Sequence, residues 1–210
     1  MEDVLDFYER SPQPGVIRLC FDEKPCQLLG EIVAPLPMKS EQIKKQDYEY
    51  ERNGHCVILL AYDLDQGKRF LQVRKHRKKQ DYAEFMQWLV ERHYPQAEAI
   101  EIVQDNLNTH SYGAFYENLP CQQAHELKNK INFHFTPKHA SWLNMAEIEF
   151  SALSKQCLDR RIATMEALEQ ETLAWMQQRN DKFIKIDWKF NKLHARDKLQ
   201  RLYKNVNSNN

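Results

Sequence analysis

The sequence lacks the patterns that mark several other classes of protein. No apolar run is long enough to cross a membrane, and the first residues, MEDVLDFYER, are acidic and amphipathic, unlike a signal peptide. No two cysteines have CxxC spacing, so the sequence indicates neither a zinc site nor a disulfide framework. The five cysteines are scattered at Cys20, Cys26, Cys56, Cys121 and Cys157. We therefore expect a reduced, cytoplasmic protein with no membrane partner.

The charges balance over the whole chain but are unevenly spread. The 210 residues include 30 basic and 30 acidic side chains. Residues 1–15 carry four acids and one base. Residues 68–79 carry seven Lys or Arg and no acid, and residues 179–204 carry nine Lys or Arg and three Asp. A charged run is most often a solvated surface. Two basic segments flanking a carboxylate-rich middle would also suit a polyanion held over an acidic site.

Six segments are expected to be extended. They are rich in β-branched and aromatic residues, or they alternate between apolar and polar positions. The segments are 16–22, 27–33, 55–63, 68–74, 99–105 and 131–136. A turn at 65–67 makes a hairpin of the two strands beside it. Residues 34–54 form a polar connection of a length that is usually functional or mobile in a compact domain.

Helical periodicity marks most of the remaining segments. In residues 80–94, apolar side chains recur at i, i+3, i+4 and i+7 until Pro95 stops the pattern. The other expected helices are 1–10, 113–129 with a break at Pro120, 143–158, 164–180 and 190–203. This alternation of strands and helices predicts an α/β fold with a mixed sheet.

Three acids occupy positions where an α/β sheet usually places functional groups. Asp22 and Asp105 each end a predicted strand, and functional groups in open α/β sheets gather beyond the carboxyl ends of strands. Glu147 lies in the first turns of the helix that follows the last strand. Three converging carboxylates would form the oxygen-rich kind of site that Mg²⁺ or Mn²⁺ favours. Two such ions can activate a nucleophile and stabilise a leaving oxygen in phosphodiester chemistry.

Each acid also has a purely structural interpretation. Asp22 could cap a turn, Asp105 could belong to an Asx turn, and Glu147 could favour the helix dipole. Two other acids compete for the same role. Asp63 also ends a strand, although the hairpin turn after it indicates the opposite end of the sheet, and Glu149 is separated from Glu147 only modestly on the helical wheel.

The three acids lie in motifs that resemble those of the DDE transposases. These motifs are CFDEKPCQLLGE with Asp22, VQDNLNTH with Asp105 and TPKHASWLNMAEIE with Glu147. The sequence is similar to the bacterial insertion-sequence 630 family of the mariner-type superfamily over nearly the whole chain. The resemblance implies a ribonuclease-H-like fold in which the three acids are catalytic and hold two Mg²⁺ or Mn²⁺ ions. It also implies cleavage of DNA by water and joining of the freed 3′-hydroxyl to target DNA, in the bacterial cytoplasm at the nucleoid.

The resemblance also implies partners and a domain organisation. Relatives carry helix-turn-helix domains before the catalytic domain, whereas only a short helix and SPQPG precede the first strand here. We expect residues 1–15 to be the remnant of that connection, residues 16–165 the catalytic domain, and residues 166–210 a basic helical extension packed on it. The chain would be an active transposase, as a homodimer on DNA, or a truncated or accessory form that only binds DNA or a full-length partner. A host nuclease of this fold is a third alternative.

Further residues are expected to support the site. Basic side chains could follow the DNA backbone through salt-sensitive contacts that carry no sequence preference. This DNA-binding set is Lys75, Arg77, Lys78, Lys79, Lys138, His139, Arg160 and Arg161. Asn106, His110 and Glu149 are candidate supporting residues. His110 could position water or contact phosphate, or could be an ordinary hydrogen-bonding residue.

Overall fold

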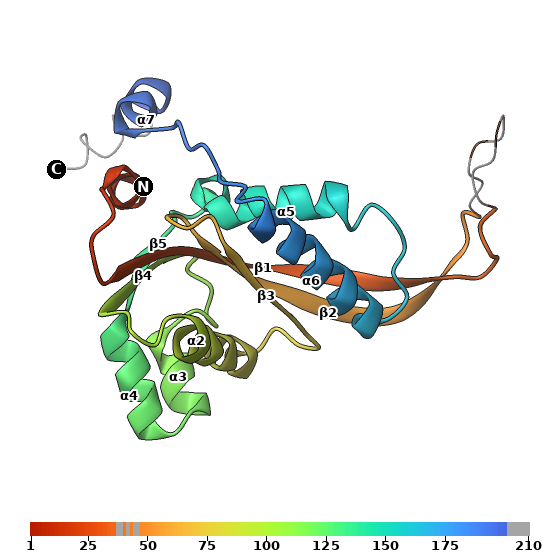
Figure 1. Cartoon of the computed structure of the whole chain (residues 1–210), viewed down its shortest axis with the longest axis horizontal. Coiled ribbons are helices and arrows are strands. Elements are labelled where there is room, and N and C mark those ends of the chain that lie inside the picture. The colour runs from red at the N-terminus through yellow and green to blue at the C-terminus, as the bar shows by residue number, and fades with distance from the viewer. Residues whose placement is uncertain (37–39, 41–42, 44–46, 201–210) are drawn as a thin grey trace.

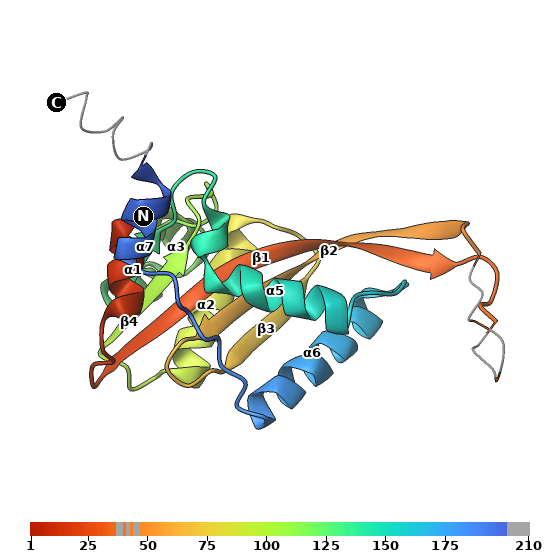
Figure 2. The same ribbon diagram turned by 90° about the horizontal axis from the view of Figure 1, so that it is seen from above.

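The fold is built around one mixed five-stranded sheet (Figures 1 and 2). The computed structural model describes residues 1–36, 40, 43 and 47–200. The strand order is β3–β2–β1–β4–β5, with β1 at Val16–Glu31, β2 at Tyr50–Asp63, β3 at Arg69–Arg74, β4 at Ala99–Gln104 and β5 at Ile131–Phe135. The pairs β1–β4 and β4–β5 are parallel and the other two pairs are antiparallel. The predicted α/β fold with a mixed sheet is confirmed.

Helices cover both faces of this sheet (Figure 1). One face carries α2 (Lys79–His93), α3 (Tyr112–Asn118) and α4 (Cys121–Lys130), and the other carries α5 (Met145–Gln156) and α6 (Met165–Asp181). The predicted break at Pro120 separates α3 from α4. The last predicted helix is shorter than expected, because α7 spans Lys192–Lys198, and residues 201–203 lie outside the described part. In that described part, no helix is both long and apolar enough to span a membrane.

The first strand differs most from the sequence prediction. The sequence predicts two extended pieces, 16–22 and 27–33, whereas β1 runs without interruption from Val16 to Glu31. The prediction that a strand ends at Asp22 is wrong, because β2 still pairs with β1 as far as Glu31 after β4 has ended. Beyond that point β1 is an edge strand on its β4 side, where a proline such as Pro25 is tolerated.

The C-terminal half of β1 and the N-terminal half of β2 extend past the rest of the sheet as a two-stranded arm (Figures 1 and 2). The register of the pair shifts between Gln27 and Leu29. Part of the predicted 34–54 loop is therefore strand, since β2 begins at Tyr50, and residues 37–39, 41–42 and 44–46 of it lie outside the described part.

Alternation along β1 divides the interior into two cores. Leu19 and Phe21 point to the face covered by α2, α3 and α4, where they pack with apolar residues of those helices. Cys20, between them, points to the opposite face and packs with Val103 of β4 and apolar residues of α5 and α6. Because side chains alternate between faces in a strand, Asp22 is placed on the α5 side. The site is thus positioned by the same pattern that builds the core.

The acidic N-terminal segment and part of the basic C-terminal segment bind each other. Helix α1 (Glu2–Glu9) buries its apolar side against the α5-side core. Two of its acids pair with α7: Arg196 Nε lies 2.8 Å from Glu2 Oε1, and Lys192 pairs with Asp6. The positive charge of this part of the C-terminal segment is therefore balanced within the chain.

A buried ion pair joins α5 to the edge of the sheet and to α6. Glu149 receives two hydrogen bonds of 2.7 Å from Arg69 of β3 and two of 3.2 Å from Arg179 of α6. The side chains of Arg69 and Glu149 have no exposed surface. Glu149, a candidate supporting residue and a rival of Glu147, is therefore committed to structure and is not available as a metal ligand.

Replacing Glu149 with Gln should strongly destabilise the fold, because it leaves Arg69 buried without its full counter-charge. Removing one member of a buried ion pair costs about 3–5 kcal/mol. For a chain of this size the melting temperature should fall by at least about 6 °C. Glu147→Gln is the matched control, since that exposed side chain lies two positions away in the same helix and its loss should cost under about 1 kcal/mol. Thermal unfolding followed by circular dichroism checks both, and equal melting temperatures would contradict the assignment.

Candidate active site

The register of two parallel strands places Asp22 and Asp105 together. The last residues paired between β1 and β4 are Cys20 and Val103. Asp22 lies two residues further along β1, and Asp105 lies two residues after Val103, directly past the end of β4. Residues two apart lie on the same face, so both carboxylates emerge on the α5 side at the same level of the sheet. The sequence prediction that these two acids converge has a direct structural basis here.

Asn144 connects the third acid to the first. Its side-chain oxygen accepts a hydrogen bond of 3.1 Å from the backbone N–H of Ala146 and so caps the N-terminus of α5. Its amide group donates to the Phe21 carbonyl oxygen at 2.8 Å and to Asp22 Oδ2 at 3.2 Å. The helix that carries Glu147 in its first turn therefore begins beside Asp22. Glu147 itself is exposed, so its carboxylate is accessible from outside the protein.

Asp22 is electrostatically crowded. The residue is only 9 % exposed. The pKa of its carboxyl group is raised to about 7. Burial is the main cause and the nearby charges of Glu147 and Asp105 add to it, while a hydrogen bond from the Glu23 N–H and the charge of His110 oppose the rise. The influence of Glu147 and Asp105 on this pKa shows that the three carboxylates share one electrostatic environment. Perturbed acids of this kind concentrate at functional sites.

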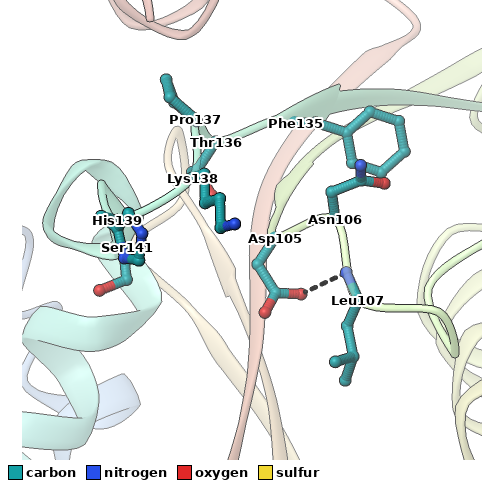
Figure 3. A pocket seen from close by; sticks show the side chains of 9 residues that line it. All are labelled: Asp105, Asn106, Leu107, Phe135, Thr136, Pro137, Lys138, His139 and Ser141. Carbon is teal, nitrogen blue, oxygen red and sulfur yellow. Dashed lines mark hydrogen bonds between the residues drawn. The ribbon is translucent and has the colours of Figure 1, made fainter.

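Asp105 is held in place by its own loop. Its Oδ1 atom accepts a hydrogen bond of 3.3 Å from the Leu107 N–H and lies 2.6 Å from Nδ1 of His110 (Figure 3 shows the first of these). The hydrogen bond to His110 holds the pKa of Asp105 below its usual range. Burial disfavours a charged His110, but its contacts with Asp105 and Glu23 prevail and raise its pKa to about 9. The pair is therefore an anion beside a cation at neutral pH.

A cavity of about 710 Å³ opens beside Asp105 (Figure 3). Two connections form it, one after β4 and one after β5, and in Figure 3 the Lys138 ammonium group points toward Asp105. His139 has a left-handed backbone, with φ of 63°. The residues that line the cavity are Asp105, Asn106, Leu107, Phe135, Thr136, Pro137, Lys138, His139 and Ser141. Three expected site residues, Asn106, Lys138 and His139, are thus brought next to an acid.

The other members of the predicted DNA-binding set do not line this cavity. Arg161 binds Glu31 at 2.6 Å and the backbone carbonyl oxygens of 47–49, so it fastens the arm. Arg160 pairs with Glu171, and Lys79 pairs with Glu117. Lys75 lines a different cavity, at the start of α6. Lys78 precedes α2, and its N–H donates to Asp81.

The rival acid Asp63 has a structural role. It lies opposite Leu19 in the sheet, three pairs away from Asp22. Its carboxylate accepts the N–H groups of Asp65 and Gln66 and the hydroxyl of Tyr94. Asp63 therefore caps the β2–β3 turn, as its hairpin context predicts.

Two residues of the site escape prediction from sequence. Asn144 could have been recognised as a helix cap, but its hydrogen bonds to β1 depend on a contact between distant segments. The side chain of Glu23 is only 5 % exposed and contacts Arg77 and His110. Nothing in the local sequence signals either contact.

The donor set suits a divalent metal ion, although the ligands are not fully gathered. Carboxylate oxygens are the ligands that Mg²⁺ and Mn²⁺ prefer. Among the described residues, no three His, Cys, Asp or Glu side chains lie close enough together to hold a metal ion by themselves. The arrangement is therefore an open acidic site in which water or phosphate oxygens would complete the coordination.

The whole fold is shared with solved transposase structures. The Mos1 mariner paired-end complex with Mn is similar with a TM-score of 0.56 and 14% identity, over 87% of this chain and 56% of that one. The catalytic domain of Mos1 mariner transposase is similar with a TM-score of 0.53 and 12% identity, over 79% and 72% of the two chains. The Mos1 mariner paired-end complex with Mg is similar with a TM-score of 0.54 and 16% identity, over 86% of this chain and 53% of that one. The expected ribonuclease-H-like fold is thereby confirmed.

The chain spans a little over half the length of the Mos1 chains in the paired-end complexes. A search of curated protein sequences finds no match. The family model described as "DDE superfamily endonuclease" matches residues 18–169, which include Asp22, Asp105 and Glu147. The chain therefore belongs to the DDE superfamily of endonucleases.

Proposed function

We propose that this chain is the catalytic domain of a DDE transposase, of the insertion-sequence 630 family within the mariner-type superfamily. Asp22, Asp105 and Glu147 are the catalytic acids. The observation that carries the proposal is the common level of Asp22 and Asp105 on the sheet, with Asn144 linking Asp22 to the helix that bears Glu147. The reaction is metal-dependent cleavage of a DNA strand followed by strand transfer.

The three acids would hold two Mg²⁺ or Mn²⁺ ions. Bound ions of this kind supply activation of the attacking oxygen and stabilisation of the leaving oxygen in phosphodiester chemistry. Burial raises the pKa of Asp22 most, and repulsion by Glu147 and Asp105 adds to the rise; a divalent cation would relieve that repulsion. Solved Mos1 complexes with Mn and with Mg support the choice of metals.

The protein's own groups bind and orient the DNA. Lys138 and His139 stand at the cavity beside Asp105, where they can contact the phosphate backbone. Asn144 holds Asp22 at a fixed distance from α5 by donating to one of its oxygens. Among the other basic residues of the predicted set, four pair with acids of the chain, namely Arg77, Lys79, Arg160 and Arg161. Lys75 and Lys78 are proposed to follow the DNA backbone. The proposed partners are transposon ends and target DNA, bound by a homodimer or together with a full-length transposase.

Mn²⁺ should stabilise the unmodified chain and not the Asp105→Asn variant. A ligand at one hundred times its Kd stabilises by about 2.7 kcal/mol, which corresponds to a rise in melting temperature of at least about 5 °C here. Calorimetric titration and thermal unfolding with and without Mn²⁺ measure this. Asp187→Asn is the matched control, because that carboxylate is 78% exposed and pairs only with Lys189 among the contacts described. Equal stabilisation of the unmodified chain and Asp105→Asn would exclude Asp105 as a ligand.

Asp22→Asn, Asp105→Asn and Glu147→Gln should each abolish Mn²⁺-dependent nicking of plasmid DNA. Loss of several kcal/mol of transition-state stabilisation lowers the rate by about 10³-fold or more. The folds should persist, as checked by circular dichroism. Nicking at an unchanged rate in all three variants would refute the active-site assignment. DNA binding without nicking by the unmodified chain would instead support the accessory form.

Lys138→Gln should weaken DNA binding uniformly across sequences and lower its dependence on salt. Loss of one phosphate contact reduces the slope of log K against log salt concentration by about 1. Fluorescence anisotropy of labelled duplexes at several salt concentrations gives this slope. Lys128→Gln, on the exposed side of α4 and across the sheet, is the control and should leave the slope unchanged. Identical slopes for both variants would remove Lys138 from the DNA path.

A further inference from the structure

We propose that His110 is a positioning residue for the metal site: one ring nitrogen fixes the carboxylate of Asp105, and Glu23 orients the ring through the other nitrogen. The inference deepens the proposed function and rests on it, because a fixed carboxylate serves the reaction only if Asp105 is a ligand. It assigns a role to the histidine of the VQDNLNTH motif and to the acid next to Asp22 in the first motif.

Both ring nitrogens of His110 face carboxylates. Nδ1 lies 2.6 Å from Oδ1 of Asp105, and Nε2 lies 3.4 Å from Oε2 of Glu23 without hydrogen-bond geometry. The side chain of His110 has no exposed surface. Its ring stacks on Tyr82 with centroids 4.9 Å apart and meets Phe21 edge-on at 5.3 Å. The imidazole is therefore confined on its faces and at both nitrogens.

The loop that carries His110 is tied to the end of β4. The side-chain amide of Gln104 donates to the His110 carbonyl oxygen at 3.3 Å, and its oxygen accepts from the Tyr82 hydroxyl at 2.8 Å. Gln104 is completely buried. The backbone of His110 is thus fixed to the residue that directly precedes Asp105.

Glu23 supports the ring from the other face of β1. Adjacent residues of a strand point to opposite faces, so Glu23 does not share the open side on which Asp22 lies. Its Oε1 atom lies 2.6 Å from Nε of Arg77, and its other oxygen faces His110. Arg77, expected to contact DNA, is thus the outer member of a chain of charges that runs through Glu23 and His110 to Asp105.

This chain of contacts leaves one particular oxygen of Asp105 available. Oδ1 is used by His110 and by the Leu107 N–H, whereas no hydrogen bond to Oδ2 is found in the described part of the chain. His110 therefore presents Oδ2 toward the open side of the site. Residues that orient a metal ligand in this way typically change metal affinity by about 10–100-fold when they are replaced.

Two substitutions separate the two nitrogens of His110. In His110→Asn the side-chain N–H₂ group lies near the position of Nδ1, so it can still donate to Asp105. In His110→Gln the side-chain N–H₂ group lies near the position of Nε2, so it cannot donate to Asp105. Both variants are neutral amides in the same buried space, so a general loss of packing affects them alike.

The measurement is Mn²⁺ affinity of the full chain by calorimetric titration, at a temperature where circular dichroism shows each variant folded. We expect His110→Asn to keep an affinity close to that of the unmodified chain, and His110→Gln to bind about 10–100-fold more weakly. Equal losses in the two variants would overturn the positioning role. So would an unchanged affinity in His110→Gln when Asp105→Asn no longer binds.

A failure of the proposed function looks different. Mn²⁺ binding that persists in Asp105→Asn, or that is absent from the unmodified chain, would overturn the metal site itself and the role of His110 with it. Glu23→Gln completes the set. An orienting Glu23 should give an intermediate loss of affinity, whereas binding lost as completely as in Asp105→Asn would make Glu23 a ligand and overturn its assignment.

Discussion

The unequal lengths of β1 and its two neighbours are the constraint on which the site depends. β4 stops pairing at Val103 while β2 continues, so β1 loses one neighbour at Cys20. Beyond that point the sheet has an open corner. Asp22 lies on the strand that continues and Asp105 on the chain that leaves, so both acids face the same gap. Helix α5 begins at Asn144, whose side chain binds the Phe21 carbonyl oxygen and Asp22 Oδ2, so the start of this helix lies beside the gap.

The site concentrates negative charge and balances only part of it. Burial and two neighbouring carboxylates disfavour the charge of Asp22, while Asp105 is stabilised by a histidine cation. A chain selected for stability alone would not keep such an arrangement, because burying an uncompensated charge is unfavourable. Glu149 shows the alternative: two positions from Glu147, the same side-chain type is fully neutralised by two arginines. Of the two glutamates in this helix, Glu149 is structural, and Glu147 is the exposed acid that we propose to be functional.

Much of the fold follows from sequence because its elements carry local signals. The periodicity of α2 and the break at Pro120 each predict what is observed. The end of β1 was not predictable, because Asp22 looks like a strand terminus and only the pairing partner of the following residues decides otherwise. Motifs indicated the three acids, and the β1–β4 register accounts for the common level of Asp22 and Asp105. The roles of Glu149, Glu23 and Arg161 depend on partners 80, 87 and 130 positions away, which no local pattern contains.

The arm formed by β1 and β2 has a mechanical consequence for Asp22. Asp22 and the outer end of the arm belong to the same strand, nine residues apart, which is about 30 Å of extended chain. A rigid ribbon of that length would act as a lever and would convert movement at its tip into rotation of the strand at the site. The register shift between Gln27 and Leu29 interrupts this lever, and the Leu29 N–H is anchored to the Ile162 carbonyl oxygen at 2.9 Å. Between Asp22 and its outer end, the arm is therefore joined to the segment that precedes α6.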